Sequence, residues 1–411
     1  MNVAVVIPVW NGASVIEACL TAVFSQTHAH LHEVICVDNG SQDQSKQLIE
    51  AQFPQVTLLP QPVNLGFAGG VNVGLRQATA DLLVLLNQDC LVQPGWLEAL
   101  CQAVEDNKNL GIVGGRILNA DQTVNHAGAF LERPLAYGRH ITTEDHPVEY
   151  VTGALFGITR RAWETIGEFD EGFFPAYYEE TDYCFRAKQS GFEIGYVPEA
   201  TAVHLFNNQS WQSDPIEHCA NQHAMRYRFV AKQFSQAELA QFFPAETKAI
   251  SEEIYYEQAI GRFLGARQLL HTLNATLAAR TAHLNRPRSP GEVQQLTASF
   301  SQLRQHALQT ATQKEWQETL QMLQSYQQQE HDLLARIYFI EPGTGHNEPR
   351  WKRLWRLLVL RPFSFLIGRD YYLLAQLNTI HVARFDQMSK LQRLIERRLL
   401  LLEAVTRYEH R

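Results

Sequence analysis

Cysteine is scarce in this chain, and long apolar runs are missing. The six cysteines are scattered, with no CxxC pair among them, which argues against a disulfide framework and against a zinc site. The closest approach to a long apolar run, residues 357–368, is interrupted by Arg361 and Pro362, so no segment reaches the roughly 18 uncharged residues of a membrane-spanning helix. Residues 1–10, MNVAVVIPVW, lack a basic leader and predict a strand rather than a signal peptide. We therefore expect a cytoplasmic protein with reduced thiols.

Basic residues are few in the first half of the chain. Residues 1–210 hold 24 Asp and Glu but only 10 Lys and Arg, whereas residues 211–411 hold 19 acidic and 25 basic residues. The two halves therefore face different partners, and we expect no nucleic acid among them. The whole chain has 411 residues, 45% hydrophobic and 19% charged, which is typical of a soluble globular protein with two or three domains.

Strand-like and helix-like segments alternate over the first 210 residues. This alternation predicts a parallel α/β sheet, whose ligands bind at the carboxyl ends of the strands. Polar residues occupy three such ends: Asn11 follows the first strand, Asp38 ends the second, and Asn87 and Asp89 follow a third. Each alone could be an ordinary turn residue. Together they indicate a binding site.

An acidic cluster lies in the stretch YYEETDYCFR, residues 177–186. Two interpretations stay open for its three carboxylates. In a first helical turn they would favour the helix dipole, and Asp182 could pair with Arg186 four residues later. Alternatively, crowded carboxylates raise each other's pKa, which suits a group that accepts a proton near neutral pH.

The ordered set of motifs resembles the inverting family 2 glycosyltransferases of the GT-A fold, nearest their rhamnosyltransferase and galactofuranosyltransferase branch. The resemblance covers about half the chain. The matching segments, in family order, are VVIPVWNG (5–12), VDNGSQD (37–43), NLGFAGGVNVGL (64–75), LLNQD (85–89), VTGALFGITRRAWETIGEFDEGFF (151–174), YYEETDYCFRAKQSG (177–191) and VHLFNNQS (203–210). It implies a Rossmann-like mixed sheet and transfer of a sugar, with inversion, from a nucleotide diphosphate to an acceptor hydroxyl.

The resemblance also implies how the donor is held. Asp38 matches the family carboxylate that accepts the pyrimidine N–H, with Pro8 and Asn11 shaping the same pocket, so a dTDP or UDP donor is expected. Asp89 ends the family's aspartate motif and would ligate Mn²⁺ or Mg²⁺, and His204 resembles the histidine that completes the metal site. An imidazole ligand favours manganese over magnesium.

Further donor-site residues follow from the same likeness. Asn87 stands where the wider family often has aspartate, so we assign it to the donor or to the outer shell of the metal. Asn64, Gly66 and Asn72 belong to the glycine-rich segment that lines the donor site in the family. Alternatively, the glycines of this segment have only a structural role, in a loop and a helix start whose backbone requires glycine.

The family's general base falls on Glu180. Family members usually carry aspartate there, and the extra methylene of glutamate moves the carboxylate, so Glu180 is either a tuned base or a sign of lost activity. We place Glu179 and Asp182 as acceptor-binding or orienting groups. Gly153 and Ala154 match a small-residue turn beside the acceptor cleft.

Beyond about residue 215 the resemblance fades and helical periodicity prevails. We expect a GT-A domain over residues 1–235, a helical extension over 236–340 and a basic amphipathic helical tail over 341–411. The extension would serve oligomerisation, acceptor positioning or docking to a partner. The tail carries 13 basic and 5 acidic residues from position 350 on; it would either contact anionic lipid at the inner face of the cell membrane or pack on the helical bundle.

The favoured function is a metal-dependent inverting glycosyltransferase, most simply a rhamnosyltransferase that uses dTDP-rhamnose in the synthesis of a cell-wall or other surface polysaccharide. Its acceptor would be a glycan or a lipid-linked sugar. Two alternatives stay open: a UDP-sugar donor such as UDP-galactofuranose, and a catalytically inactive GT-A scaffold in a polysaccharide assembly complex.

Overall fold

The computed structural model describes residues 1–25, 30–142, 147–205 and 215–339. The chain divides into two compact units, Met1–Lys314 and Glu315–Arg411. The functional residues expected from the sequence all lie in the first unit. The predicted basic tail, residues 341–411, lies outside the described residues.

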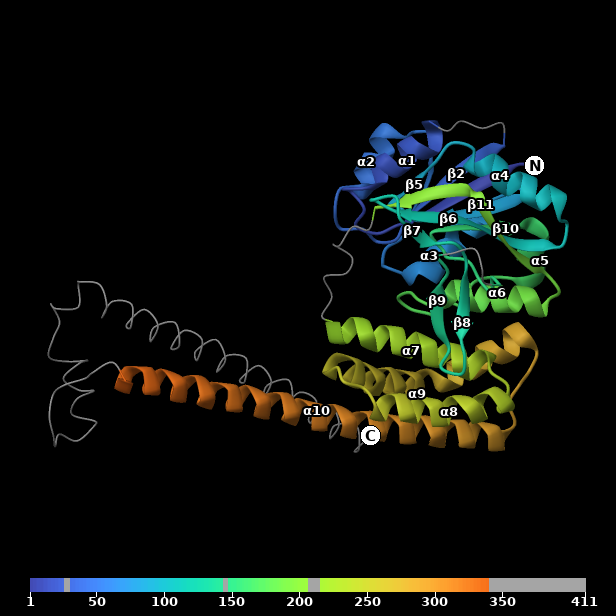
Figure 1. Cartoon of the computed structure of the whole chain (residues 1–411). Helices are drawn as coiled ribbons and strands as arrows, with labels where there is room; N and C mark the ends of the chain where they lie inside the picture. Colours follow the sequence, from blue (N-terminus) through green and yellow to red (C-terminus); the bar gives the residue numbers. More distant parts are fainter. Residues whose placement is uncertain (26–29, 143–146, 206–214, 340–411) are drawn as a thin grey trace, which may run out of the picture. The chain divides into compact units, whose positions relative to one another are not determined.

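A mixed sheet of nine strands forms the centre of the first unit (Figure 1). The strand order is β3-β2-β1-β4-β10-β6-β11-β5, with β7 paired to β6. The strands are β1 (Val3–Val9), β2 (Leu31–Asp38), β3 (Thr57–Pro60), β4 (Leu82–Leu86), β5 (Cys90–Val92), β6 (Leu110–Asn119), β7 (Val124–His126), β10 (Leu155–Thr159) and β11 (Glu193–His204). The α/β class with a mixed sheet is confirmed. All-parallel pairing is wrong, because β10 and β5 run antiparallel to their neighbours.

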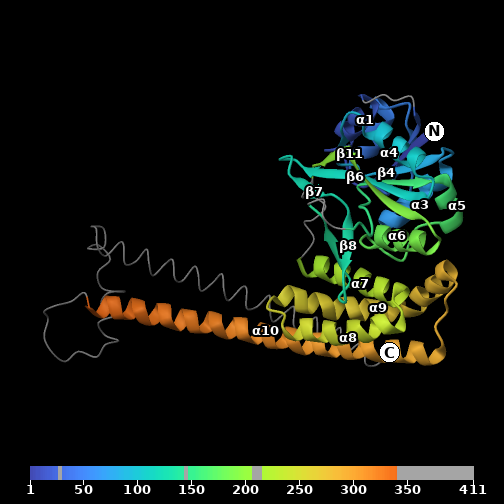
Figure 2. The same cartoon turned by 45° about the vertical axis from the view of Figure 1, so that its right-hand side comes forward.

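Helices cover both faces of this sheet (Figures 1 and 2). Strands β1 and β4 are apolar and buried along nearly their whole length, as expected for strands covered on both faces. The helices on one face are α1 (Ile16–Ser25), α2 (Ser45–Gln52) and α4 (Trp96–Asp106), and those on the other are α3 (Gly66–Gln77), α5 (Arg160–Ile166) and α6 (Glu179–Gln189). The catalytic candidates Glu179 and Glu180 thus begin α6.

The rest of the described chain is helical, as predicted. The helices are α7 (Pro215–Gln233), α8 (Gln236–Ser251), α9 (Tyr256–Leu284) and α10 (Pro290–Phe339). Helices α7 and α9 pack closely, because α9 presents glycine to α7: a Cβ at Gly265 would lie only 2.8 Å from the Ala224 nitrogen. Over the described residues, no helix has both the length and the apolar character needed to cross a membrane.

A two-stranded hairpin, β8 (Ala129–Glu132) and β9 (Tyr137–His140), extends between the sheet and α7 (Figures 1 and 2). Its tip is held by hydrogen bonds to three other elements. The hydroxyl of Tyr178 donates to the Ala136 carbonyl at 2.7 Å, Arg226 of α7 donates to the Leu135 carbonyl at 2.6 Å, and Arg262 of α9 donates to the hydroxyl of Tyr137 at 3.0 Å. The hairpin therefore joins the helical region to the catalytic helix.

Candidate active site

Asn11 and Asp38 tie together the loops at the carboxyl ends of β1 and β2. Asp38 is buried and lies opposite Val9 in the parallel register. Its Oδ1 accepts from the Ser41 N–H at 3.1 Å, so the carboxylate does make the local bond of an ordinary turn residue. Asn11 has a φ of 49°, and its side-chain oxygen accepts from the Gln42 N–H at 2.8 Å. The two predicted donor-site residues are adjacent, and Pro8 precedes them on β1.

The glycine-rich segment is held against β2 by Asn39, a residue that the sequence analysis missed. The Asn39 side chain donates to the Gly66 carbonyl at 2.9 Å and accepts from the Leu65 N–H at 2.9 Å. Asn64 accepts from the Gly66 N–H at 2.8 Å. Gly66 has a φ of 72°, and a Cβ there would meet the Phe174 ring at 2.8 Å. Glycine is therefore needed where this loop meets the segment before α6.

Asn72 was predicted to be a donor-site residue, and its side chain is bonded within the protein itself. Asn72 is completely buried, and its amide pairs with the Phe169 backbone in both directions, at 3.0 and 2.9 Å. A further bond joins it to Glu171 at 3.1 Å. Asn72 therefore fastens α3 to the segment before α6.

Replacing Asn72 by alanine is expected to lower the free energy of unfolding by about 1–3 kcal/mol, because the Phe169 N–H and C=O lose their buried partners. Affinity for the nucleotide should not change. Urea unfolding followed by circular dichroism and calorimetric titration with a nucleotide diphosphate check both points. Unchanged stability together with weakened nucleotide binding would restore the donor-site interpretation.

Asp89 and His204 meet although 115 positions separate them. His204 Nε2 lies 2.9 Å from Asp89 Oδ1, and both side chains are partly exposed. Antiparallel pairing places His204 opposite Cys90, which follows Asp89. Cys90 Sγ lies within the same cluster of potential ligand atoms, but burial, and then the charge of Asp89, raises the pKa of its thiol. A carboxylate and an imidazole are donors that suit Mn²⁺, so these residues fit the divalent ion that the family implies.

Helix α6 starts from an unusual backbone. Tyr177 and Tyr178 both have positive φ, 87° and 66°, which is rare for residues with side chains. Their side chains are anchored: Tyr178 bonds to the hairpin, and the Tyr177 hydroxyl lies 3.3 Å from His218 Nδ1 of α7. Such backbone persists where the surroundings fix it. It directs Glu179 and Glu180 from the first turn of α6.

The two glutamates at the start of α6 have raised pKa values. Burial raises the pKa of Glu180 to about 7. Burial and then the nearby charge of Glu180 raise the pKa of Glu179 well above its ordinary value. Glu179 is 5% exposed, and its Oε2 has no hydrogen-bond partner among the described residues. Both shifts favour the protonated form of these carboxyl groups, and the pKa of Glu180 lies close to neutral pH.

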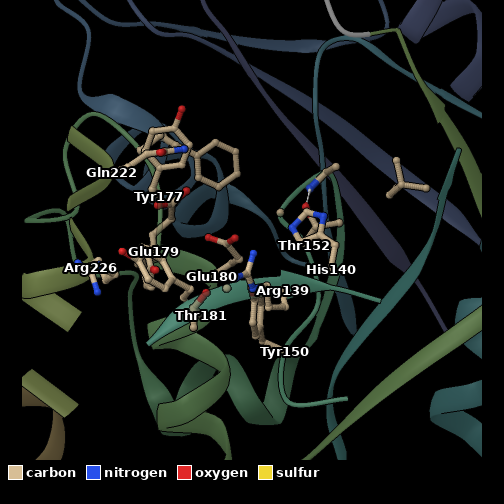
Figure 3. A pocket seen from close by; sticks show the side chains of 18 of the residues that line it. Arg139, His140, Tyr150, Thr152, Tyr177, Glu179, Glu180, Thr181, Gln222 and Arg226 are labelled. Carbon is tan, nitrogen blue, oxygen red and sulfur yellow. Dashed lines mark hydrogen bonds between the residues drawn. The ribbon is translucent and has the colours of Figure 1, made fainter. Parts of the chain in front are cut away.

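A pocket of about 550 Å³ lies at the start of α6, where Glu179 and Glu180 line it (Figure 3). Asn87 and His204 line it as well. The turn at Thr152, Gly153 and Ala154, expected beside the acceptor cleft, also lines it. Pro8, Asn11 and Asp38 lie outside its lining. Asp89 is also not among the lining residues, so the cleft brings Glu180 together with His204, the partner of Asp89.

Part of the pocket wall was not predicted. The hairpin contributes Tyr137, Arg139 and His140, while α7 contributes Gln222, His223 and Arg226 (Figure 3). Gln258 of α9 lines it as well. No catalytic group was expected beyond about residue 215, yet helices α7 and α9 form a wall of the cleft. Their periodic sequences identify helices but do not reveal which face of each helix meets the cleft.

Asp182 was predicted to be an acceptor-binding or orienting group, and the structure places its side chain away from the pocket. Asp182 is completely buried and is not among the residues that line the pocket. Its Oδ2 accepts from Arg186 Nε at 3.0 Å, which is the pairing that the first interpretation of the acidic stretch expected. The orienting role that we also assigned to Asp182 fits this geometry.

Comparisons with known proteins agree with this fold. Residues 4–167 match the sequence model of the family described as Glycosyl transferase family 2. An N-acetylglucosaminyl-diphospho-decaprenol L-rhamnosyltransferase of Mycobacterium tuberculosis is 27% identical over 233 residues, which cover 49% of this chain and 75% of that protein. Glycosyltransferase AglE of Haloferax volcanii is 33% identical over 207 residues, covering 49% of this chain and 66% of AglE.

A solved structure supports the fold. The crystal structure of GalNAc-T7 with UDP, GalNAc and Mn²⁺ superposes with a TM-score of 0.50 at 14% identity, covering 67% of this chain and 57% of that one. At this identity the likeness concerns the GT-A fold alone. The sequence matches and this structural likeness agree: the chain carries a Glycosyl transferase family 2 domain and is a glycosyltransferase.

Proposed function

We propose that this glycosyltransferase transfers rhamnose from dTDP-rhamnose, with inversion, to a hydroxyl of a glycan or lipid-linked sugar during synthesis of a surface polysaccharide. The observation that carries the proposal is the pocket that holds Glu180 and His204 together. The similarity to a rhamnosyltransferase that acts on a diphospho-decaprenol acceptor supports the choice of sugar and acceptor. A UDP-sugar such as UDP-galactofuranose remains the alternative donor.

Glu180 would act as the general base. A glutamate with a pKa of about 7 can take a proton from a hydroxyl near neutral pH. As the proton passes to Glu180, the acceptor oxygen bonds to the anomeric carbon, and the bond from that carbon to the diphosphate oxygen breaks. The electron pair leaves with the diphosphate. Inversion follows because a single displacement occurs from the opposite face.

Glu179 would hold the acceptor sugar. As a protonated acid it can donate a hydrogen bond to a sugar oxygen through its unpartnered Oε2, and Gln222 lies near it at the same wall (Figure 3). The ring of Tyr177, which also lines the pocket, would contact the sugar ring.

Asp89 and His204 would hold a divalent cation, most simply Mn²⁺. When bound, such an ion supplies positive charge that neutralises the diphosphate of the leaving nucleotide. Asn87 lines the pocket, and its backbone is fixed by bonds to the Ala154 carbonyl at 3.2 Å and from the Cys90 N–H at 3.1 Å. It would contact the donor or a water of the ion. Asp38, with Pro8 and Asn11, would receive the pyrimidine.

Replacing Asp89 by alanine is expected to abolish the manganese dependence of dTDP binding, because a single imidazole cannot hold the ion in place. Calorimetric titration with dTDP, with and without MnCl₂, measures this. Asp106→Ala on the exposed face of α4 is the matched control. Equal manganese-dependent binding by Asp89→Ala and by the wild type would exclude Asp89 as a ligand.

A transfer assay distinguishes an active transferase from the inactive-scaffold alternative. Wild-type protein, dTDP-rhamnose, MnCl₂ and a lipid-diphosphate-linked N-acetylglucosamine are combined, and the product mass is measured. A mass increase of one deoxyhexose supports the proposal. Tight nucleotide binding without transfer to any acceptor would favour the scaffold. The proposal includes two further roles. The basic tail would hold the enzyme at the inner face of the membrane, and the helical extension would mediate self-association.

A further inference from the structure

Lys232 places an ammonium group at the centre of a buried cluster behind the catalytic helix. The residue lies in the last turn of α7 and is completely buried. Its Nζ is 2.8 Å from Asp170 Oδ2, 2.8 Å from Asp182 Oδ2 and 3.0 Å from His283 Nδ1. An ammonium group has three N–H donors. All three are used, on partners from three different segments of the chain.

The surrounding groups keep this cluster ionised and fixed. Arg228 donates to both oxygens of Asp170, at 2.8 and 2.9 Å. Gln233 donates to Asp182 Oδ1 at 2.6 Å, and Arg186 adds its bond to Oδ2. Burial alone would raise the pKa of Asp182, but the charges of Lys232 and Arg186 outweigh it and hold that pKa below its ordinary value. Asp182 is therefore a carboxylate.

The cluster resembles a metal site but already contains its cation. Asp170, Asp182 and His283 together present the ligand atoms of a candidate metal site. The Lys232 ammonium lies within hydrogen-bonding distance of all three of these residues. Burial, and then the charge of Lys232, lowers the pKa of His283 to about 4, so its Nδ1 is neutral and accepts. The Lys232 ammonium therefore occupies the place that a bound cation would take.

The cluster acts on the same helical turn that carries Glu180. Asp182 follows Glu180 by two positions, and its backbone N–H donates to the Tyr178 carbonyl at 2.8 Å, which closes the first turn of α6. Glu180 lines the pocket, whereas the Asp182 side chain is buried among α7 and α9 residues. The positive φ of Tyr177 and Tyr178 needs such an external constraint.

We propose that Lys232 is a positioning residue for the transfer reaction: by holding Asp182 and Asp170, it fixes the first turn of α6 and so aims the Glu180 carboxylate at the acceptor hydroxyl. The proposal rests on the proposed function, since it needs Glu180 to be the base. It also makes α7 and α9 part of the catalytic unit rather than an appended module. A displacement of the base by about 1 Å can cost about 100-fold in rate.

The test compares three variants of the full-length protein with the wild type. Lys232→Met removes the ammonium while keeping an unbranched side chain. Asp182→Asn keeps the shape of the anchor, removes one charge, and is the milder variant if Lys232→Met does not fold. Lys248→Met is the matched control, because Lys248 makes only an exposed pair with Glu252. Each variant is assayed for kcat, for KM of the donor and for the pH dependence of kcat, with circular dichroism as the check on folding.

The expected result is a fall in kcat of about 10- to 100-fold for Lys232→Met and Asp182→Asn with little change in the donor KM. The acidic limb of the pH profile should also move, because the burial that sets the Glu180 pKa changes. Lys248→Met should behave as the wild type. A folded Lys232→Met or Asp182→Asn variant with wild-type kcat and pH profile would overturn the inference. A wild type that transfers no sugar would instead overturn the proposed function.

Discussion

Glu180→Gln is expected to lower kcat by about 100- to 10,000-fold, the usual loss when a positioned general base is removed. Glutamine keeps the length of the side chain and its place in the first turn of α6, but it cannot take the acceptor proton. Binding of dTDP should not change, because Glu180 is not among the residues expected to hold the nucleotide. Steady-state kinetics and calorimetric titration measure the two quantities.

Two matched variants sharpen this expectation. Glu179→Gln should lose less than about tenfold in kcat, because burial raises the pKa of Glu179 and an amide resembles the neutral acid. Glu199→Gln, on an exposed position of β11, should have no effect. Equal losses for Glu179→Gln and Glu180→Gln would show that the base assignment within the pair is wrong, and full activity of Glu180→Gln would remove Glu180 from the mechanism.

The pH dependence of kcat follows from the same carboxylate. Since burial raises the pKa of Glu180 to about 7, and since the base must be ionised, activity should rise with pH through about 7 and level off above it. A profile that is already flat from pH 5 upward would contradict the role of Glu180. The measurement is kcat at saturating donor and acceptor across this range, with stability monitored at each pH.

Glu246→Gln is expected to lower the free energy of unfolding by about 3–5 kcal/mol, as for other buried ion pairs that lose one partner. Glu246 is completely buried and accepts from Arg226 Nη1 at 2.9 Å and from the Tyr227 hydroxyl at 2.7 Å. Arg262 lies 3.6 Å away. Without the carboxylate, the buried Arg226 guanidinium loses its counter-charge, whereas Arg262 keeps its pair with Glu253 at 3.2 Å.

The pH dependence of stability gives the sign of this contribution. Burial alone would raise the pKa of Glu246, but Arg226 and Arg262 lower it to about 2. The folded-state pKa is below the unfolded value of about 4.3, so the stabilisation is present above that pH and is lost as the pH falls toward 2. Urea unfolding at several pH values measures it. Glu252→Gln, in an exposed pair, is the control, and a Glu246→Gln variant as stable as that control would contradict the account.

The sequence predicts the first part of the site well because its signals are local. A polar residue at the end of an apolar run lies at the edge of a parallel sheet, so the pattern of residues alone places Asn11, Asp38 and Asp89 at that edge. His204 was found only through its likeness to a family motif. The antiparallel pairing of β11 with β5 explains why it reaches Asp89.

The errors concern residues whose partners are distant in sequence. Asn72 looks like a polar group in a ligand loop, but its partner Phe169 lies 97 positions away. The ion pair of Arg226 with Glu246 joins α7 to α8, and the bond from Tyr178 to the Ala136 carbonyl joins the residue before α6 to the hairpin. Periodicity predicts that α7 is a helix. Periodicity alone does not predict which face of α7 packs against the site.

The most direct test of the central claim is a thermal-shift panel of thymidine, uridine, guanosine and cytidine diphosphates, each with and without MnCl₂, on the wild type and on Asp89→Ala. A ligand that binds only the folded protein raises its melting temperature. The account predicts a manganese-dependent rise for thymidine diphosphate, alone or with uridine diphosphate, that Asp89→Ala loses. No rise with any nucleotide, or a rise that ignores both manganese and Asp89, would contradict it.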